Sequence, residues 1–285
     1  MDPNAVAVSR VTPIVLYEKK AKGQRIACLT AYDYPAARLA DESGIDLILV
    51  GDSLGQVVLG YDSTLPVTAD EILHHLKAVR RGTRRALLMA DLPYGSYHAA
   101  SDLAVSTAIR FLKEGGAEAV KLEGGRKRTA LIRRLTDAEI PVAGHIGLTP
   151  QSVRVMGGYR VQGNSADTAR ELLEDALALE DAGVFALVLE GIPREVAAAI
   201  TQRLRIPTIG IGAGPDCDGQ IMVIHDLLKL TFSPPAKFVR AYASVAEIMR
   251  DAICRFREDV AGSRYPSDQE SYHLPASAHA ALSAR

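Results

Sequence analysis

Four short apolar segments of this chain each end in an acidic residue, and this pattern constrains the fold more than any other. Residues 45–50 lead directly to Asp52, and three later segments end at Asp91, Glu123 and Glu190. Each segment is too short for a helix and sufficiently apolar and β-branched for a strand buried on both faces. The pattern indicates a parallel α/β fold that brings several acidic strand ends together.

Predicted strands and helices alternate about eight times along roughly 250 residues, which is typical of a (β/α)₈ barrel. A doubly wound open sheet is the alternative, but it binds ligands at one crevice where the strand order reverses. The ends of several strands converge at the mouth of a barrel, so we predict a single-domain (β/α)₈ TIM barrel. The predicted strands are residues 25–30, 45–50, 86–90, 119–123, 140–145, 185–190, 206–211 and 237–242, and the last two predicted helices are residues 219–228 and 245–260.

Capping residues mark the starts of two predicted helices. Thr12 precedes Pro13, a hydroxyl cap followed by proline at the first helical position. Thr68 and Glu71 have the spacing of a capping box, in which each side chain bonds the other residue's backbone amide. We therefore expect one helix before the first strand and another from residue 68.

The domain boundaries and the cellular compartment follow from composition. We predict a flexible arm at residues 1–11, the barrel with its N-terminal helix at residues 12–261, and a short C-terminal tail at residues 262–285. The 33 Lys and Arg residues nearly balance 34 Asp and Glu residues, which argues against a nucleic-acid partner. No apolar run approaches the roughly 20 residues of a membrane span, and the three cysteines form no C-x-x-C pair. We expect a cytoplasmic protein with no membrane partner.

Asp52, Asp91 and Glu123 follow three consecutive predicted strands and are expected to lie side by side at one rim. A single acid after a strand is more often a helix cap or turn residue than a ligand, by about two to one. Three neighbouring carboxylates, however, repel one another unless a cation lies among them. Their oxygens, with no accompanying cysteine cluster, suit Mg²⁺ best, with Mn²⁺ or Co²⁺ as substitutes.

Lys121, His145 and Glu190 are the other candidate site residues. Lys121 lies two residues before Glu123, so both point into the barrel; it either neutralises the acids or holds a substrate anion, and the two roles are compatible. His145 ends the fifth predicted strand, where a structural hydrogen bond and a functional role are about equally expected. Glu190 lies across the mouth from the other acids, either as a rim salt bridge or as a base for a bound substrate.

Two further motifs carry less information. Residues 210–214 (Gly-Ile-Gly-Ala-Gly) are spaced like a phosphate-binding loop, but Pro215 replaces the last glycine of the dinucleotide fingerprint. This spacing supports only tight turning or close approach of the backbone to a ligand. His74 and His75 are adjacent on a predicted helix and cannot face one metal ion.

Longer motifs make the chain similar to the ketopantoate hydroxymethyltransferase family, from about Thr12 to about His273. The motifs that carry the resemblance are Thr30-Ala-Tyr-Asp33, Val50-Gly-Asp-Ser-Leu-Gly55, Asp62-Ser-Thr-Leu-Pro-Val-Thr68, Ala90-Asp-Leu-Pro93, Lys121-Leu-Glu-Gly-Gly125, Gly144-His-Ile-Gly-Leu-Thr-Pro-Gln-Ser152, Gly157-Gly-Tyr-Arg-Val-Gln-Gly163, Leu189-Glu190 and Gly210-Ile-Gly-Ala-Gly214. Motifs of this length are highly specific. Arg160 and Lys229 depart from the family pattern, which has Lys and Gly there. The first change bears on loop or cofactor contacts and the second only on how its helix ends, so the expected chemistry is unaffected.

The resemblance implies an activity, residue roles and an assembly. The activity is transfer of a hydroxymethyl unit from 5,10-methylenetetrahydrofolate to 3-methyl-2-oxobutanoate through a Mg-stabilised enolate, giving 2-dehydropantoate and tetrahydrofolate in pantothenate and coenzyme A biosynthesis. The implied assembly is a homodecamer of two stacked pentamer rings. The implied metal ligands are Asp52, Asp91 and Glu123, the oxoacid contacts are Asp52, Ser53, Asp91 and Lys121, and the catalytic residues are Glu190 as proton acceptor and His145 as a site histidine.

Two other functions remain open from the sequence. The first is a metal-dependent carbon–carbon lyase of the phosphoenolpyruvate/isocitrate lyase type, which generally carries a cysteine on a mobile catalytic loop. None of Cys28, Cys217 and Cys254 has that setting. The second is a non-catalytic oxoacid-binding protein of the same fold, against which the intact acids at four strand ends argue.

Overall fold

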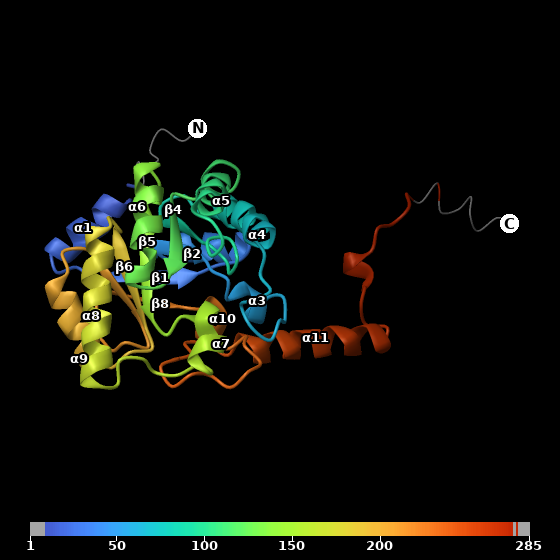
Figure 1. The fold of residues 1–285 in the computed structure, drawn as a ribbon. Coiled ribbons are helices and arrows are strands. Elements are labelled where there is room, and N and C mark those ends of the chain that lie inside the picture. The colour runs from blue at the N-terminus through green and yellow to red at the C-terminus, as the bar shows by residue number, and fades with distance from the viewer. Residues whose placement is uncertain (1–8, 276–277, 279–285) are drawn as a thin grey trace.

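Eight parallel strands close into a barrel in chain order, β1 to β8, in a computed structural model that describes residues 9–275 and 278. The strands are β1 (Ile26–Thr30), β2 (Leu47–Val50), β3 (Leu87–Asp91), β4 (Ala119–Glu123), β5 (Val142–Gly147), β6 (Ala186–Glu190), β7 (Thr208–Ile211) and β8 (Gly219–Met222). The helices are α1 (Pro13–Ala21), α2 (Tyr34–Glu42), α3 (Leu54–Val57), α4 (Ala69–Gly82), α5 (Ser101–Lys113), α6 (Thr129–Asp137), α7 (Val153–Met156), α8 (Ala166–Asp181), α9 (Arg194–Arg203), α10 (Ile224–Leu227) and α11 (Val245–Ala261), with 3₁₀ turns η1 (Arg126–Arg128), η2 (Pro150–Ser152) and η3 (Asp268–Glu270). The predicted (β/α)₈ barrel is confirmed (Figure 1).

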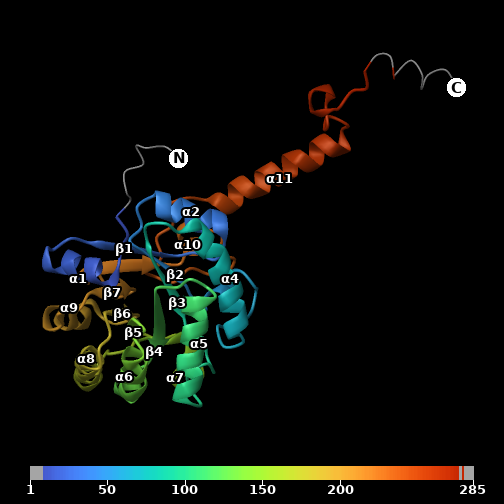
Figure 2. The same cartoon turned by 90° about the horizontal axis from the view of Figure 1, so that it is seen from above.

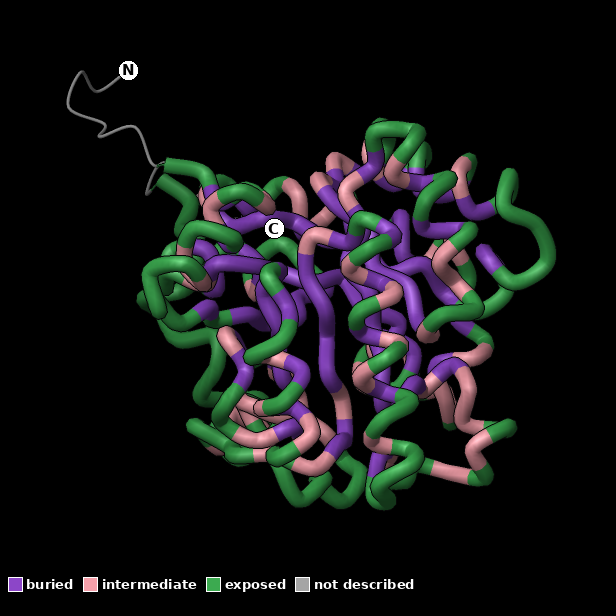
Figure 3. The backbone as a smooth tube through the Cα atoms, turned by 60° about the vertical axis from the view of Figure 1, so that its left-hand side comes forward, coloured by how far each residue is buried: buried purple, intermediate pink, exposed green. Residues whose placement is uncertain are grey.

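Alternation along the strands divides the core into two layers. Inward-pointing residues such as Leu47, Met89 and Val188 form one apolar cluster inside the barrel. The residues between them, such as Ile48 and Leu88, belong to a larger cluster shared with the surrounding helices. Figure 3 shows the buried strands at the centre and the exposed faces of the helices outside. This two-layer packing fixes which strand residues face the barrel interior.

Both predicted helix caps are present. The side chain of Thr12 accepts a hydrogen bond from the backbone N–H of Val15 at the start of α1. Leu16 of this helix is fully buried in the inner cluster, so α1 closes the end of the barrel away from the site. Thr68 and Glu71 form the complete capping box at the start of α4.

The predicted eighth strand is wrong, and the predicted helix before it forms only in its second half, as α10. Residues 237–242 form no strand and are largely exposed, whereas β8 is formed by Gly219–Met222, the start of the predicted helix. Close approach of β8 to β1 explains the glycine, because a Cβ at Gly219 would lie 2.6 Å from the carbonyl oxygen of Ile26. A four-residue strand offers too short an alternation to outweigh the helical pattern that follows it.

The last predicted helix forms, but it does not cover the barrel. Figures 1 and 2 show α11 projecting away from the barrel, attached only through its first turn. It has no buried residue, and its apolar side chains include exposed Ile248, Ile253 and Phe256. The helix therefore leaves an apolar surface exposed in the single chain.

The N-terminal segment is partly held against the barrel. Most of the predicted arm (residues 1–8) lies outside the described residues, but Val11 is buried and its N–H donates to the carbonyl of Arg85 at 2.8 Å. Within the described part of the chain, no helix is long and apolar enough to cross a membrane.

Candidate active site

The carboxyl ends of the strands surround a cavity of about 730 Å³. Every residue that the sequence placed in the site lines this cavity: Asp52, Ser53, Asp91, Lys121, Glu123, His145 and Glu190. The structure therefore brings the predicted residues together at the C-terminal mouth, where TIM-barrel active sites lie. Their individual roles stay predictions.

Strand alternation and register explain why these side chains line one cavity. Asp91, Lys121, Glu123, His145 and Glu190 occupy the inward positions that continue the inner apolar cluster toward the mouth. The parallel register places Asp91 beside Lys121 and Glu123 beside His145 on neighbouring strands. A shift of one residue in any of these strands would turn its site residue outward.

Asp52 and Asp91 form a buried carboxylate pair with one cation beside it. The backbone N–H of Asp52 donates to Oδ2 of Asp91 at 3.3 Å. The ammonium nitrogen of Lys121 lies 2.9 Å from Oδ1 of Asp91, and both side chains are almost fully buried. One lysine thus faces two carboxylates at this side of the mouth.

His145 joins the acids on the two sides of the mouth. Its Nδ1 lies 3.4 Å from Oε1 of Glu123 and 3.4 Å from the ammonium nitrogen of Lys121. Its Nε2 lies 3.2 Å from Oε2 of Glu190. The imidazole therefore holds Glu190 in place from the interior, while that carboxylate remains partly open to the cavity.

Burial and neighbouring charges shift the pKa values of the three acids. Burial, followed by the charges of Asp91 and Glu123, raises the pKa of Asp52 well above its usual range. Burial also raises the pKa of Asp91, although the ammonium of Lys121 opposes this. Burial acts in the same direction on Glu123, but hydrogen bonding to His145 outweighs it and lowers the pKa of Glu123. The Asp52–Asp91 pair is the part of the site that most lacks positive charge.

Opposing influences act on His145. Burial and the charge of Lys121 lower its pKa, but its close contacts with the carboxylates of Glu123 and Glu190 outweigh them and raise the pKa to about 9. The imidazole is therefore protonated at neutral pH and serves as a cation between two carboxylates. A neutral histidine is the form that would accept a proton, so this protonation state favours Glu190 over His145 as the base.

The raised pKa of His145 predicts how the stability of the metal-free protein depends on pH. Because the folded pKa lies above the ordinary value of 6.5, this stabilisation is complete below about pH 6.5 and is lost as pH rises through about 9. Urea unfolding in EDTA at a series of pH values should show the free energy of unfolding falling more steeply in the wild type than in His145→Gln. Parallel curves for the two proteins would contradict this charge state.

The donor set at Asp52 and Asp91 fits a hard divalent cation. Within the described part of the chain, Oδ1 of Asp91 makes no hydrogen bond, although the ammonium of Lys121 lies beside it. Mg²⁺ usually takes one or two carboxylates and completes its shell with water and substrate oxygens. Two buried, mutually repelling carboxylates supply that kind of site.

Glu123 does not complete a three-acid cluster in this arrangement. Among residues 9–275 and 278, no three His, Cys, Asp or Glu side chains are placed to hold a metal ion together. One oxygen of Glu123 meets His145, and the other accepts the backbone N–H of Gln151 at 3.1 Å. The ligand role of Glu123 stays a prediction, as do those of Asp52 and Asp91.

Two site residues, Gln151 and Tyr97, were not singled out from the sequence. The amide nitrogen of Gln151 donates to Oδ2 of Asp52 at 2.9 Å, and its amide oxygen accepts from the hydroxyl of Tyr97 at 2.6 Å. The backbone N–H of Glu123 in turn donates to that hydroxyl at 3.2 Å. Gln151 thus ties Asp52 to the loop after β5, and only its place in the Thr149-Pro-Gln-Ser152 segment pointed to the site.

The two remaining features of the sequence analysis are Ser53 and the glycine-rich loop. The hydroxyls of Ser53 and Tyr32 lie 2.7 Å apart at the cavity wall, which orients Ser53. At the glycine-rich loop, a Cβ at Gly212 would lie 2.6 Å from the ring of Phe238, and one at Gly214 would lie 2.4 Å from Arg194. These glycines, both at positive φ, serve close packing of the loop.

Comparison with solved structures supports the fold. The chain is similar to 2,3-dimethylmalate lyase, a member of the PEP mutase/isocitrate lyase superfamily, with a TM-score of 0.56, 16% identity, and 95% and 94% of the two chains covered. It is also similar to phosphonopyruvate hydrolase in complex with oxalate and Mg²⁺, with a TM-score of 0.56, 16% identity and 92% of each chain covered. At these identities the likeness concerns the barrel alone.

Sequence comparison identifies the family. The model of the family described as ketopantoate hydroxymethyltransferase matches residues 10–268. The 3-methyl-2-oxobutanoate hydroxymethyltransferase of Koribacter versatilis (strain Ellin345) is 64% identical over 274 residues, covering 96% of this chain and 93% of the relative. The enzyme of the same name from Carboxydothermus hydrogenoformans is 53% identical, covering 94% and 97%. With these matches over nearly its whole length and the acidic residues of the motifs gathered at one barrel mouth, the chain belongs to the ketopantoate hydroxymethyltransferase family.

Proposed function

We propose that the protein transfers a hydroxymethyl unit from 5,10-methylenetetrahydrofolate to 3-methyl-2-oxobutanoate, giving 2-dehydropantoate and tetrahydrofolate in pantothenate biosynthesis. The observation that carries the proposal is the position of Glu190, held by His145 across the mouth from the Asp52–Asp91 pair. A carboxylate opposite a cation site is placed to deprotonate a substrate anchored there. Family membership supplies the identity of the substrates.

The oxoacid would be held by the side of the mouth that carries Lys121. Burial lowers the pKa of this lysine, but the charges of Asp91, Glu123 and Asp52 outweigh it and raise the pKa further above its ordinary range. The ammonium is therefore charged and suited to the oxoacid carboxylate, with the Ser53 hydroxyl as a second donor. Asp52 and Asp91 would hold Mg²⁺, or Mn²⁺ or Co²⁺ in its place. When bound, the cation would draw electron density from the keto oxygen and so acidify the hydrogen on C3.

Glu190 would then accept the C3 proton, and His145 would keep its carboxylate aimed at the substrate. Placing the base on β6 and the cation site on β2 and β3 separates proton removal from charge stabilisation. The C3 carbanion forms the new bond to the one-carbon unit, and tetrahydrofolate leaves. Since the donor carries a methylene group and the product a hydroxymethyl group, the overall transfer consumes one water.

A turnover assay tests this proposal directly. Protein, Mg²⁺, 3-methyl-2-oxobutanoate and 5,10-methylenetetrahydrofolate should give equal amounts of 2-dehydropantoate and tetrahydrofolate, and omitting any component should stop the reaction. A protein that binds the oxoacid without turnover would be the non-catalytic alternative. Cleavage of a longer 2-hydroxy or 2-oxo acid would indicate a lyase instead. Against a lyase, Cys28 and Cys217 are buried away from the cavity lining, and Cys254 lies on α11, outside the barrel.

We also propose a homodecamer of two pentamer rings, supported by the family resemblance and by the exposed apolar face of α11. Ile248, Ile253 and Phe256 on this helix are more than half exposed in the single chain, so association would remove apolar surface from water. Sedimentation velocity at micromolar concentration should give a mass near ten times the 30.6 kDa of one chain. A profile dominated by monomer would contradict the decamer.

A further inference from the structure

A second cavity of about 460 Å³ lies on the same rim of the barrel, outside the mouth. Its lining comes from the segments that follow β2, β3, β4 and β5, four of the five strands whose ends carry site residues. The two cavities share walls: Thr64 and Pro150 line the first, and their chain neighbours Leu65 and Gln151 line the second. Gln151 also donates to Asp52, so one side chain separates the second cavity from the site.

The second cavity is strongly cationic. Lys127, Arg128 and Arg154 line it, and no acidic residue does. Among the described residues, none of these three side chains has a carboxylate oxygen within 4.0 Å, whereas neighbouring Arg126 pairs with both Glu174 and Asp175. Unpaired cations around a concave surface favour an anionic ligand.

The lowered pKa of His98 reflects this positive potential, and aromatic rings give the cavity a flat wall. Burial lowers the pKa of His98, and the charges of Arg128 and Lys127 lower it further. The guanidinium of Arg128 is fixed over the ring of Tyr97, 4.9 Å from its centroid. The ring of Tyr94, about half exposed, lies 4.6 Å from that of His98 and offers an aromatic surface beside the cations.

We propose that this cavity binds the anionic glutamate tail of the folate donor, with Lys127 and Arg154 as its carboxylate-binding residues. The inference rests on the proposed function, because that function requires a folate beside the Asp52–Asp91 pair. The ligand would place its one-carbon unit in the first cavity and carry its tail over the shared wall. Arginine pairs with carboxylates through two parallel N–H donors, and each added glutamate supplies one more carboxylate. Affinity should therefore rise with tail length and fall with salt.

Calorimetric binding of tetrahydrofolate with one or three glutamates tests the proposal without turnover. The wild type should bind the triglutamate more tightly, and Lys127→Gln and Arg154→Gln should each reduce that preference about two- to fivefold, as exposed charge pairs do. The preference is a ratio within one protein, so a general loss of folded protein does not change it. Arg128 is left intact because its Nε also donates to the backbone carbonyl of Glu123.

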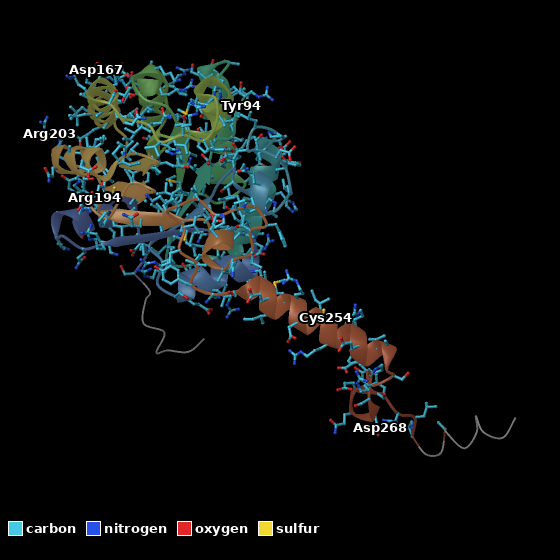
Figure 4. The ribbon with its side chains drawn as sticks, turned by 90° about the horizontal axis from the view of Figure 1, so that it is seen from below. Tyr94, Asp167, Arg194, Arg203, Cys254 and Asp268 are labelled. Atoms are coloured by element: carbon cyan, nitrogen blue, oxygen red, sulfur yellow. The ribbon has the colours of Figure 1, made fainter. Side chains whose placement is uncertain are left out.

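Arg203→Gln is the matched control. Arg203 is an exposed arginine at the end of α9, without a carboxylate partner among the described residues, and lies across the barrel from Tyr94 in Figure 4. This variant should keep the full triglutamate preference. Equal binding of the two folates by the wild type, or an unchanged preference in both cavity variants, would overturn the proposal. Failure of the proposed function would be a different result, namely no folate turnover and no proton exchange at C3 of the oxoacid.

Discussion

Replacing Glu190 by glutamine is expected to slow proton exchange at C3 of 3-methyl-2-oxobutanoate by about 10²–10⁴-fold, the usual contribution of a positioned general base. Glutamine keeps the size of the side chain and can still contact Nε2 of His145, but it cannot accept the proton. Binding of the oxoacid should be retained, because Lys121 and the Asp52–Asp91 pair are untouched. Calorimetry of oxoacid binding and NMR of the exchange in heavy water measure the two properties separately.

A second variant separates the base from the residue that positions it. His145→Gln removes the cation that holds Glu190 but leaves the carboxylate, so exchange should fall less than in Glu190→Gln and should show an altered pH profile. Undiminished exchange in Glu190→Gln would assign the base to another residue, and His145 would be the first candidate.

Asp52→Asn or Asp91→Asn is expected to abolish most of the divalent-cation affinity and the turnover together, while the barrel stays folded. Asp52→Asn removes one carboxylate from a pair that repels itself in a buried environment, so this variant without metal should be at least as stable as the wild type. Asp91→Asn also removes the close partner of the buried Lys121, so no such gain is expected for it. Titration of Mg²⁺ in the presence of oxoacid measures the first effect, and urea unfolding in EDTA measures the second.

Asp167→Asn serves as the control for this experiment. Asp167 is exposed at the start of α8, is paired only with Arg170 among the described residues, does not line the site cavity, and lies at the outer edge of the barrel in Figure 4. It should bind Mg²⁺ like the wild type. Unchanged Mg²⁺ binding in both Asp52→Asn and Asp91→Asn would refute the assignment of the metal site to this pair.

The acidic strand ends could be predicted from the sequence because strand alternation and parallel register are local properties. Once Asp91, Glu123 and Glu190 are known to end parallel strands, barrel closure alone places them around one mouth. The role of Gln151 could not be predicted in this way. Its contacts with Asp52 and Tyr97 join segments that are 99 and 54 residues apart, and no short pattern encodes such a contact.

The one wrong strand and two features that the pattern leaves open have a similar origin. The sequence pattern does not predict the short strand β8, because its identity depends on pairing with β1 and β7, which four residues do not reveal. The orientation of Glu123 toward His145 and Gln151 depends on the loop after β5, so the sequence could place this acid at the mouth but not choose its partners. Likewise, the amphipathic pattern of α11 predicted a helix but not the surface that it would cover.

Folate-free proton exchange by the wild-type protein tests the central claim most directly, because it isolates the base and the cation from the one-carbon donor. Incubation of protein, Mg²⁺ and 3-methyl-2-oxobutanoate in heavy water should replace the C3 hydrogen by deuterium, with loss of the methine signal and collapse of the methyl doublet. EDTA should stop the exchange, since proton removal depends on the cation. Absence of exchange without folate, or exchange at the full rate in EDTA, would contradict the account.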